Sequence, residues 1–449
     1  MLTDNLVLVL MGFIGIIILI LVLWQPYLGI VFTITTLPII DLLPSIPLFS
    51  SITPLLGLVT LVGYLFQFKK GPQNWKKGLN VVYLLGIVYV FWVFLSNPNA
   101  ALLSGDRNWL FTFVQLWVMM LLSGELLKTP EKQKTAILVF AMAAMVSALF
   151  AIIRGDIAED ALNSARIAGL ATNANQAARY FVVAMVFFYY LRIKTEAPFA
   201  KLLFLIGIIV TFLGVFFTVS RSGILLLFGA VGLIFILRSK IKQRVGLILL
   251  VVMGLFILSL FSDSIFRIIQ GIFPAISEGT DTVGLRYNLW RAGWRMWLDY
   301  PVQGIGIGNY NSNLWRYMFD MAGPTRGSAS SHNTFVQVLS ETGIIGFIIF
   351  MAMLINAFKH FWPSKHKPVD GDEDLRDMWF IILMVITVGG VTITDLANKL
   401  LWMVMGISVI YGSPRSVTEE VSQENQVDNK RIYSKLSCSR FSHKRSWQK

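Results

Sequence analysis

The sequence predicts an all-α protein that crosses a membrane many times, with about 12 transmembrane helices and one large loop outside the membrane. Of its 449 residues, 55% are hydrophobic and only 14% are charged, whereas a soluble domain carries roughly 25% charged residues. The apolar residues come in long runs, and a helix of about 20 apolar residues spans the hydrocarbon core of a bilayer. The third observation is the long stretch 263–331, which separates two groups of these runs.

The first apolar run, residues 6–24, predicts a retained helix and not a cleaved signal peptide. No basic segment precedes it, and Trp24-Gln25-Pro26-Tyr27 follows it where a cleavage site needs small residues. The next run, 27–43, is interrupted by Pro38, so we expect a short or re-entrant helix there. Both chain ends then lie inside; a full span at 27–43 would place the N-terminus outside. Further helices are expected near 46–66, 79–96, 109–127, 135–153, 175–191, 202–219, 222–237, 245–262, 333–357, 377–391 and 397–412.

The basic residues predict the topology of these helices. The net charge is +13, with 38 Lys and Arg. Most of them lie in five loops and in the tail after residue 412. The order of the helices allows all five loops to lie on the same side of the membrane. Loops on the cytoplasmic side are enriched in Lys and Arg, so the positive charge is a topology signal and needs no nucleic-acid partner. The five loops are 67–78, 128–134, 192–201, 238–244 and 358–376.

We expect the chain to have four parts. A transmembrane bundle, 1–262, precedes an external loop, 263–332, then C-terminal transmembrane helices, 333–412, and a basic cytoplasmic tail, 413–449. The tail lacks apolar periodicity and is expected to be disordered or to lie on the anionic inner leaflet. Cys438 is the only cysteine, which excludes an intramolecular disulfide and a cysteine-rich metal site.

The centre of the external loop predicts an amphipathic helix at the membrane surface. Three tryptophans recur there at helical spacing, and so do two arginines, which gives an aromatic face and a basic face. These residues are Trp290, Trp294, Trp297, Arg291 and Arg295. The tryptophans are equally typical of a plain interfacial anchor. Arg286 runs against the bias of arginine towards the cytoplasmic side and indicates an anionic partner.

A glycine-rich segment follows, Asp299-Tyr300-Pro301-Val302-Gln303-Gly304-Ile305-Gly306-Ile307-Gly308-Asn309. A dinucleotide site would need a strand before it and a helix after it within a βαβ unit, and neither is expected here. We interpret it as a tight turn in which the backbone approaches another part of the protein closely.

His332 and Glu341 are the predicted catalytic residues. His332 is expected at the outer end of a membrane helix, where the free amides and the helix dipole disfavour an imidazolium. A neutral imidazole is a competent general base, although an ordinary helix cap is the alternative for His332 taken alone. Glu341 lies nine residues further, about 13 Å deeper along a helix, and a carboxylate within a membrane is a functional candidate by default.

Several more polar residues are predicted at the outer membrane face. Arg221 occupies a corner between two spans, and Asn175 and Arg179 open the helix near residue 175. An arginine at this depth is costly unless it is paired or faces water. Converging arginines would bind a pyrophosphate through charge-assisted, often bidentate hydrogen bonds. The predicted pyrophosphate ligands are Arg166, Asn175, Arg221, Arg286 and Arg291.

Taken together, these segments resemble the O-antigen ligase and polymerase family of bacterial membrane glycosyltransferases. The resemblance covers about residues 165–350 in order and spacing, and the run 299–347 is its most specific part. Many relatives carry a proline before the asparagine where this chain has Asn173-Ala174-Asn175. The matching segments are Gly169 to Ala178, Ser220-Arg221-Ser222-Gly223, Arg286 with Trp290, Pro301 to Asn309, Ser331-His332-Asn333-Thr334 and Glu341 to Gly346.

The resemblance implies a GT-C-like membrane fold and a metal-independent, inverting transfer at the outer face of the bacterial inner membrane. The donor would be a glycan on undecaprenyl pyrophosphate, and the acceptor a hydroxyl of a glycan, a lipid A core or another molecule. Arg221 and Arg286 match family arginines that bind the pyrophosphate, and His332 matches the family histidine. No metal or other cofactor is expected.

Two other classes share some of these features. A transporter that flips a lipid-linked glycan also has many helices and buried arginines, but it does not need a long outer loop that ends in a histidine at a helix start. A scaffolding membrane protein does not need an ordered set of polar positions at one face. Within the family, ligase, polymerase and protein O-glycosylation stay open, because variable outer-loop surfaces set the acceptor pocket.

Overall fold

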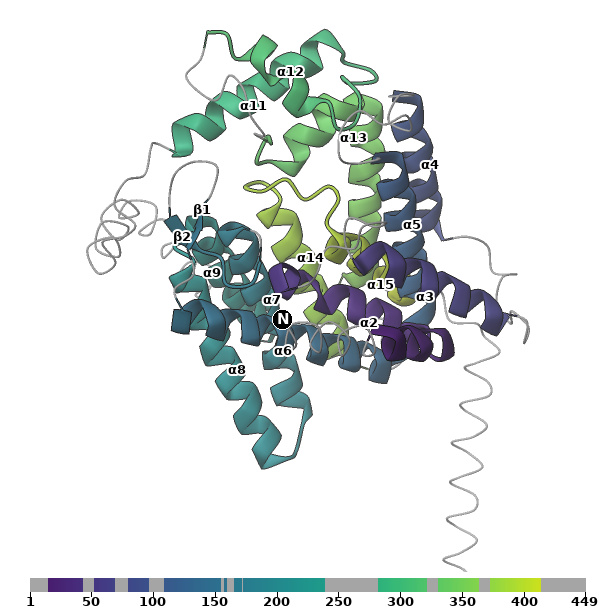
Figure 1. Cartoon of the computed structure of the whole chain (residues 1–449), viewed down its shortest axis with the longest axis vertical. Helices are drawn as coiled ribbons and strands as arrows, with labels where there is room; N and C mark the ends of the chain where they lie inside the picture. Colours follow the sequence, from purple (N-terminus) through teal and green to yellow (C-terminus); the bar gives the residue numbers. More distant parts are fainter. Residues whose placement is uncertain are drawn as a thin grey trace, which may run out of the picture. The chain divides into compact units, whose positions relative to one another are not determined.

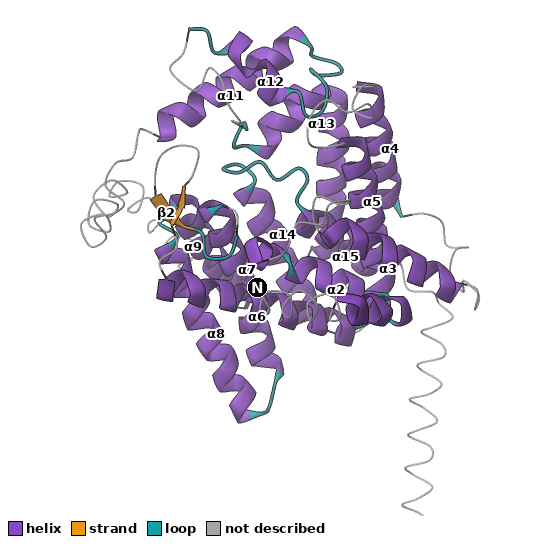
Figure 2. Ribbon diagram, viewed as in Figure 1, coloured by secondary structure: helices purple, strands orange, loops and turns teal. Residues whose placement is uncertain are grey.

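The computed structural model of the chain describes residues 15–42, 52–68, 80–96, 109–154, 157–159, 165–171, 173–238, 282–320, 330–362 and 372–412. These residues form helices and one pair of short strands (Figures 1 and 2). After a helix at Gly15–Trp24, the elements are α2 (Tyr27–Thr35), η1 (Leu37–Leu42), α3 (Ile52–Phe68), α4 (Val81–Ser96), α5 (Trp109–Leu126), α6 (Pro130–Arg154), β1 (Ile157–Glu159), β2 (Ala165–Ile167), α7 (Ala174–Lys194), α8 (Pro198–Phe217), α9 (Arg221–Arg238), α11 (Thr282–Asp299), α12 (Tyr310–Tyr317), α13 (Thr334–Phe361), α14 (Glu373–Gly389) and α15 (Lys399–Gly412).

The observed helices follow the predicted apolar runs closely. Five of the described helices are long and apolar enough to cross a membrane: α5, α6, α8, α9 and α13. The helix at 15–24, α3, α4 and α15 are apolar but shorter. The predicted run 245–262 and the tail 413–449 lie outside the described residues, and the total of about 12 spans stays a prediction.

The apolar run 27–43 forms a short helix and then a tight turn of 3₁₀ helix. α2 has only nine residues, and the backbone leaves helical geometry at Ile39, next to Pro38. This agrees with the expectation of a short helix.

The described residues are helical, as the all-α prediction requires, apart from one short pair of strands between α6 and α7. β1 and β2 form an antiparallel pair in which Ala158 lies opposite Arg166. Two strands of three residues bury little surface, so no alternation of apolar and polar residues marked them in the sequence.

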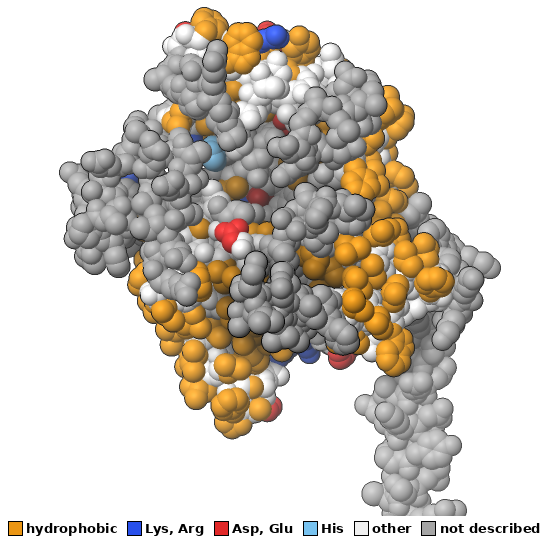
Figure 3. Space-filling model, in the orientation of Figure 1, with side chains coloured by type: hydrophobic (Ala, Val, Ile, Leu, Met, Phe, Trp, Pro, Cys, Tyr) orange, Lys and Arg blue, Asp and Glu red, His pale blue; other side chains and the backbone are white. Residues whose placement is uncertain are grey.

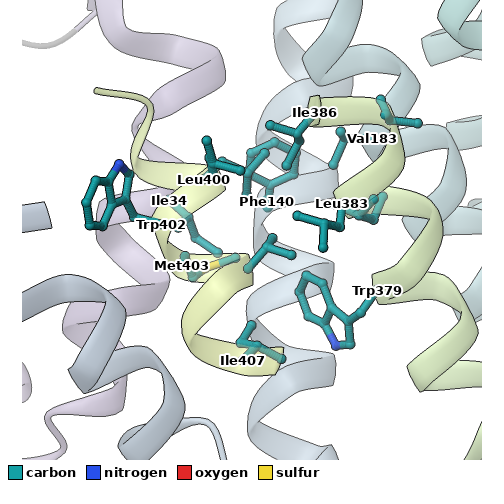
Figure 4. Close-up of a cluster of buried hydrophobic side chains, with 14 of the residues drawn as sticks. Ile34, Phe140, Val183, Trp379, Leu383, Ile386, Leu400, Trp402, Met403 and Ile407 are labelled. Atoms are coloured by element: carbon teal, nitrogen blue, oxygen red, sulfur yellow. The ribbon is translucent and has the colours of Figure 1, made fainter. Parts of the chain in front are cut away.

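α7 lies in the middle of the helix packing. It contacts α6, α8, α9 and α14, and most of its side chains from Ala174 to Leu191 are buried. Figure 4 shows part of this core, with Phe140 of α6 near its centre, Val183 of α7 and Trp379 of α14 on one side, and Trp402 of α15 on the other. Close packing of this kind supplies dispersion contacts that bind helices together even where lipid competes for the apolar surface.

α8 exposes an apolar stripe on the side turned away from α7. Leu202, Leu205, Ile209 and Leu213 are between 37% and 54% exposed, and their spacing of three to four residues places them on one face. Figure 3 shows hydrophobic side chains covering this region. Such a face is typical of a helix in contact with lipid, which agrees with the prediction of a membrane protein.

α11 and α12 form a small unit of their own within the predicted external loop. Leu289, Ala292 and Met296 of α11 pack against Tyr310 and Leu314 of α12. Figure 1 shows the pair together beside α13, and α11 contacts α13 directly. Trp294 and Leu298 on the opposite side of α11 are more than half exposed, as the predicted amphipathic helix requires.

Candidate active site

α13 is broken at Gly343, and the glycine-rich segment binds to the break. Gly343 has φ 64° and ψ −170°, which interrupts the helical hydrogen bonds on both sides. The segment 301–306 supplies hydrogen-bond partners in their place, for backbone N–H and C=O groups of α13 next to the break. Three bonds of 2.9 Å make this contact: Ile305 N to Ser340 O, Gly306 N to Glu341 O, and Ile344 N to Pro301 O.

The glycines of this segment allow the close approach that the sequence predicts. Gly304, Gly306 and Gly308 all have positive φ, a conformation that glycine adopts without steric cost. A side chain at Gly304 would collide with the backbone of Glu341, and one at Gly308 would collide with the ring of Trp109. The segment is therefore a backbone support for α13.

The same arrangement fixes the carboxylate of Glu341. This side chain is 1% exposed. Its Oε1 accepts a hydrogen bond from the backbone N–H of Tyr310 at 3.1 Å, and its Oε2 accepts one from Nε2 of Gln337 at 3.2 Å. The backbone of Gly308 also donates to the carboxylate. A buried carboxylate needs such donors, and here the loop and the helix supply them.

His332 lies two residues before the start of α13. Asn333 caps this helix, with its Oδ1 accepting from Phe335 N at 2.9 Å and Val336 N at 3.1 Å. The alternative of His332 as the cap is therefore wrong. His332 is half-buried and has φ 48°, a strained conformation for a residue with a side chain, which persists only where the surroundings hold it.

The turn between α14 and α15 holds the segment around His332. Thr334 N donates to Gly390 O at 2.7 Å, and its hydroxyl donates to Ile393 O at 2.9 Å and accepts from Asp395 N at 2.8 Å. Ser331 and Thr394 share a hydroxyl contact of 3.2 Å. Hydrogen bonds on both sides of His332 thus keep its backbone in place.

Arg221 begins α9 and is exposed, whereas Asn175 is buried at the start of α7. The side-chain oxygen of Asn175 accepts a hydrogen bond of 2.7 Å from the hydroxyl of Ser220. That hydroxyl in turn accepts from Gly223 N at 3.1 Å. Asn175 therefore holds the corner that carries Arg221, and its role as a pyrophosphate ligand stays a prediction.

Arg286 and Arg291 lie on different sides of α11. Gly293 of α11 lies against Val336 of α13, and Arg286, seven residues earlier, shares this face. Arg291 is about 140° away around the helix, is exposed, and lies 4.0 Å from Asp320. A ligand between α11 and α13 would meet Arg286 and not Arg291.

Asp320 mainly binds Arg295, which joins the end of α12 to α11. The guanidinium donates to both carboxylate oxygens, at 2.6 and 2.8 Å. These hydrogen bonds lower the pKa of Asp320 to about 2. Part of the predicted basic face of α11 is thus used inside the protein. Arg166 lies on β2 with only its backbone described, and its role stays a prediction.

A buried ion pair joins Arg179 of α7 to Asp395, and the sequence analysis missed the acid. Both side chains are at most 3% exposed, and Asn398 donates to Asp395 at 3.1 Å. Arg179 thus meets the expectation that an arginine at this depth is paired or faces water, because this acid is its partner. A lone aspartate among the apolar C-terminal runs was the available signal, since ionisable residues at membrane depth need a partner.

A cavity of about 660 Å³ lies beside these residues. Glu341 and Gln337 of α13 line it, together with Tyr310 of α12, Tyr180 of α7 and Asp395. His332, Arg221 and Arg286 do not line it, although Ser330, two residues before His332, does. Among the described residues, no three His, Cys, Asp or Glu side chains are grouped to hold a metal ion.

Residues 206–351 match the family model described as O-antigen ligase. This part of the chain is similar to the O-antigen ligase family. It begins within α8 and ends within α13, and the resemblance noted in the sequence is confirmed over this range. No curated protein matches the chain. The match supports an O-antigen ligase-type function in polysaccharide biosynthesis, in a membrane protein.

The matched range, 206–351, contains most of the predicted site. His332, Glu341, Arg221, Arg286 and Arg291 fall inside it, whereas Asn175 and Arg166 precede it. The structure joins His332 and Glu341 through α13, where Ser331 and Glu341 both contact Gln337. Arg286 is connected to α13 because α11, which bears it, packs against α13. Arg221 is connected less directly, since α9 packs against α14 and α14 packs against α13.

Proposed function

We propose that the protein is a membrane glycosyltransferase that moves a glycan from a polyprenyl pyrophosphate, such as undecaprenyl pyrophosphate, to an acceptor hydroxyl. The reaction takes place at the outer face of the bacterial inner membrane. One observation carries the proposal. Within the range that matches the O-antigen ligase model, His332 lies just before a capped helix start that is held on both sides, and α11, which bears Arg286, packs against that same helix.

In the proposed reaction the acceptor oxygen attacks the anomeric carbon of the donor sugar. His332 takes the proton of the acceptor hydroxyl, the bond between the anomeric carbon and the pyrophosphate oxygen breaks, and its electron pair leaves with the polyprenyl pyrophosphate. Attack opposite the leaving group inverts the anomeric centre. Arg221 and Arg286 bind the pyrophosphate and stabilise the growing negative charge. One well-placed donor of this kind is worth about 3–4 kcal/mol, so two cations make a metal ion unnecessary.

The experiment uses the purified full chain in liposomes with a lipid-linked glycan donor. Three acceptors are compared: a lipid A core, a second lipid-linked repeat unit, and a serine- or threonine-containing peptide. The release of polyprenyl pyrophosphate and the glycosylated product are both measured. A ligase, a polymerase and a protein glycosyltransferase differ in the acceptor used, whereas a flippase moves the donor across the bilayer without consuming it.

His332→Ala should reduce transfer by about 10²–10⁴-fold, the usual value of a general base, and should leave membrane insertion unchanged. His360→Ala, at the far end of α13, is the matched control. Transfer by His332→Ala at the wild-type rate would overturn the assignment of the base.

Arg286→Lys should raise the donor KM, because lysine offers a point charge in place of a planar fork. Arg316→Lys, on α12, makes the same change on a side chain that the proposal does not use. An unchanged donor KM in Arg286→Lys would argue against a clamp.

A further inference from the structure

The cavity beside Glu341 has no role in the reaction as proposed so far. At about 660 Å³ it falls within the range of roughly 300–1,000 Å³ that is typical of small-molecule sites. Its walls come from segments far apart in the sequence, which include α5, α7, α12, α13 and the start of α15. Its lining therefore exists only in the folded protein.

The lining of the cavity fits a neutral, hydroxyl-rich ligand. Gln176, Gln337 and Asn398 offer amides, Tyr180 offers a hydroxyl, and Trp109 offers an aromatic ring. Amides and carboxylates exchange hydrogen bonds with hydroxyl groups, and an aromatic face covers the apolar side of a sugar ring.

The same lining does not suit a diphosphate. Among the described residues that line the cavity, Lys399 is the only cation, and its ammonium group donates to the hydroxyl of Thr53 at 2.7 Å. Asp395 adds a carboxylate, and Arg179 already neutralises it from outside the cavity. The proposed pyrophosphate ligands Arg221 and Arg286 lie elsewhere.

Glu341 gives the cavity its most specific polar group. The protein orients this carboxylate through Tyr310 N on one oxygen and Gln337 Nε2 on the other, and through the backbone of Gly308. Each carboxylate oxygen has two lone pairs, so the group retains the capacity to accept from a ligand. It is 1% exposed, and a hydrogen bond from a hydroxyl to a buried carboxylate is among the stronger neutral-to-charged contacts.

We infer that this cavity is a saccharide subsite, in which Glu341 accepts a hydrogen bond from a sugar hydroxyl and Trp109 supports the ring. The inference rests on the proposed function and adds to it a binding site for one sugar unit beside the reacting bond. Ser330 lines the cavity two residues before His332, so a bound sugar adjoins the base. The sugar belongs either to the donor glycan or to the acceptor glycan.

Binding is tested on the purified full chain in nanodiscs, without donor lipid. The probes are methyl glycosides of a neutral hexose, a 6-deoxyhexose and an N-acetylhexosamine, and saturation-transfer NMR gives the dissociation constants. At least one probe should bind, and Glu341→Gln should weaken it by 10-fold or more. Glu373→Gln, the same change at an exposed position at the start of α14, should have no effect. Inorganic pyrophosphate should not displace the sugar.

A second variant guards against misfolding of Glu341→Gln. Asn311 is exposed at the rim of the cavity, so Asn311→Ala should fold normally and weaken the same sugar 2-fold or more. Equal affinity in wild type and in both variants, displacement by pyrophosphate, or the failure of every probe to bind would each overturn the inference.

Steady-state transfer then identifies the source of the sugar. If the subsite holds the acceptor, Glu341→Gln raises the acceptor KM and leaves the donor KM unchanged; if it holds the donor glycan, the reverse applies. Because sugar binding needs no transfer, it can succeed where the His332 test fails. The two proposals are thus separable.

Discussion

The two ends of α7 both carry ion pairs to the α14 region, but they differ in their surroundings. Near its start, Arg179 pairs with Asp395, and both side chains are buried. About 22 Å along the helix, Lys194 pairs with Asp372 and Asp374, each at 2.8 Å, with side chains 14–40% exposed. α7 and α14 are thus joined twice, once in a dry environment and once near water.

The difference shows that the place of a charge, and not its type, decides its importance. Surface ion pairs contribute about 0–1 kcal/mol, because water already solvates both partners. A buried pair gains little over an apolar pair, but the loss of one partner leaves an unpaired charge inside the protein. The buried pair also lies at the turn that holds the segment of His332, whereas the exposed pair lies at the opposite end of α14.

The largest expected effect is on stability, from Asp395→Asn. This change leaves the guanidinium of Arg179 buried without a counter-charge, which should cost about 3–5 kcal/mol. The free energy of unfolding in detergent, measured by SDS titration, checks the value. Asp374→Asn makes the same change at the exposed end and should cost about 1 kcal/mol or less.

A double variant separates charge from packing at the buried end. Arg179→Met with Asp395→Leu should recover most of the stability lost in Asp395→Asn, because an apolar pair needs no desolvation. Equal costs for Asp395→Asn and Asp374→Asn would remove the distinction between the two ends.

The sequence predicts contacts between residues that are close along the chain better than contacts between residues that are far apart. Apolar runs predicted nearly all of the described helices, because membrane thickness sets the helix length. They could not predict that Arg179 meets Asp395, 216 residues away, since a hydropathy pattern gives the depth of a residue but not the direction of its side chain.

Within a single helix, the sequence does predict which side chains share a face. Arg286 and Arg291 are five residues apart, and a rotation of about 100° per residue already separates them. The sequence could not predict the break at Gly343, because a glycine inside a helical pattern is usually tolerated. Only the contact with the segment 301–306 explains why the helix ends there and starts again.

Thr334→Val should have an intermediate effect at the buried end. The change keeps the shape of the side chain but removes both hydrogen bonds of its hydroxyl, to Ile393 O and from Asp395 N. The backbone groups of the buried Asp395 and the half-buried Ile393 lose a partner, which should cost about 1–3 kcal/mol. Because these bonds hold the segment of His332, transfer should fall as well, and both are measured on one preparation.

Thr135→Val is the control for this change, since the hydroxyl of Thr135 only donates to a carbonyl in its own exposed helix turn. If Thr334→Val loses stability but keeps full transfer, the turn between α14 and α15 supports the fold without positioning His332.

The smallest effect should come from the exposed end, and it should depend on pH. Burial by itself would raise the pKa of Asp372, but hydrogen bonds from Lys194 and Tyr190 outweigh it and hold this pKa below its ordinary value. A carboxylate with a lowered pKa stabilises the fold above its unfolded pKa of about 3.9, and this contribution disappears as the pH falls through the lower folded value. Lys194→Ala should therefore cost about 1 kcal/mol or less at pH 7, and the difference in stability from wild type should shrink towards pH 3.

Lys201→Ala, which removes a pair to the exposed Glu196, is the control and should show a smaller difference in stability. A constant difference from pH 7 to pH 3 would mean that Lys194 acts through packing and not through the charge of Asp372.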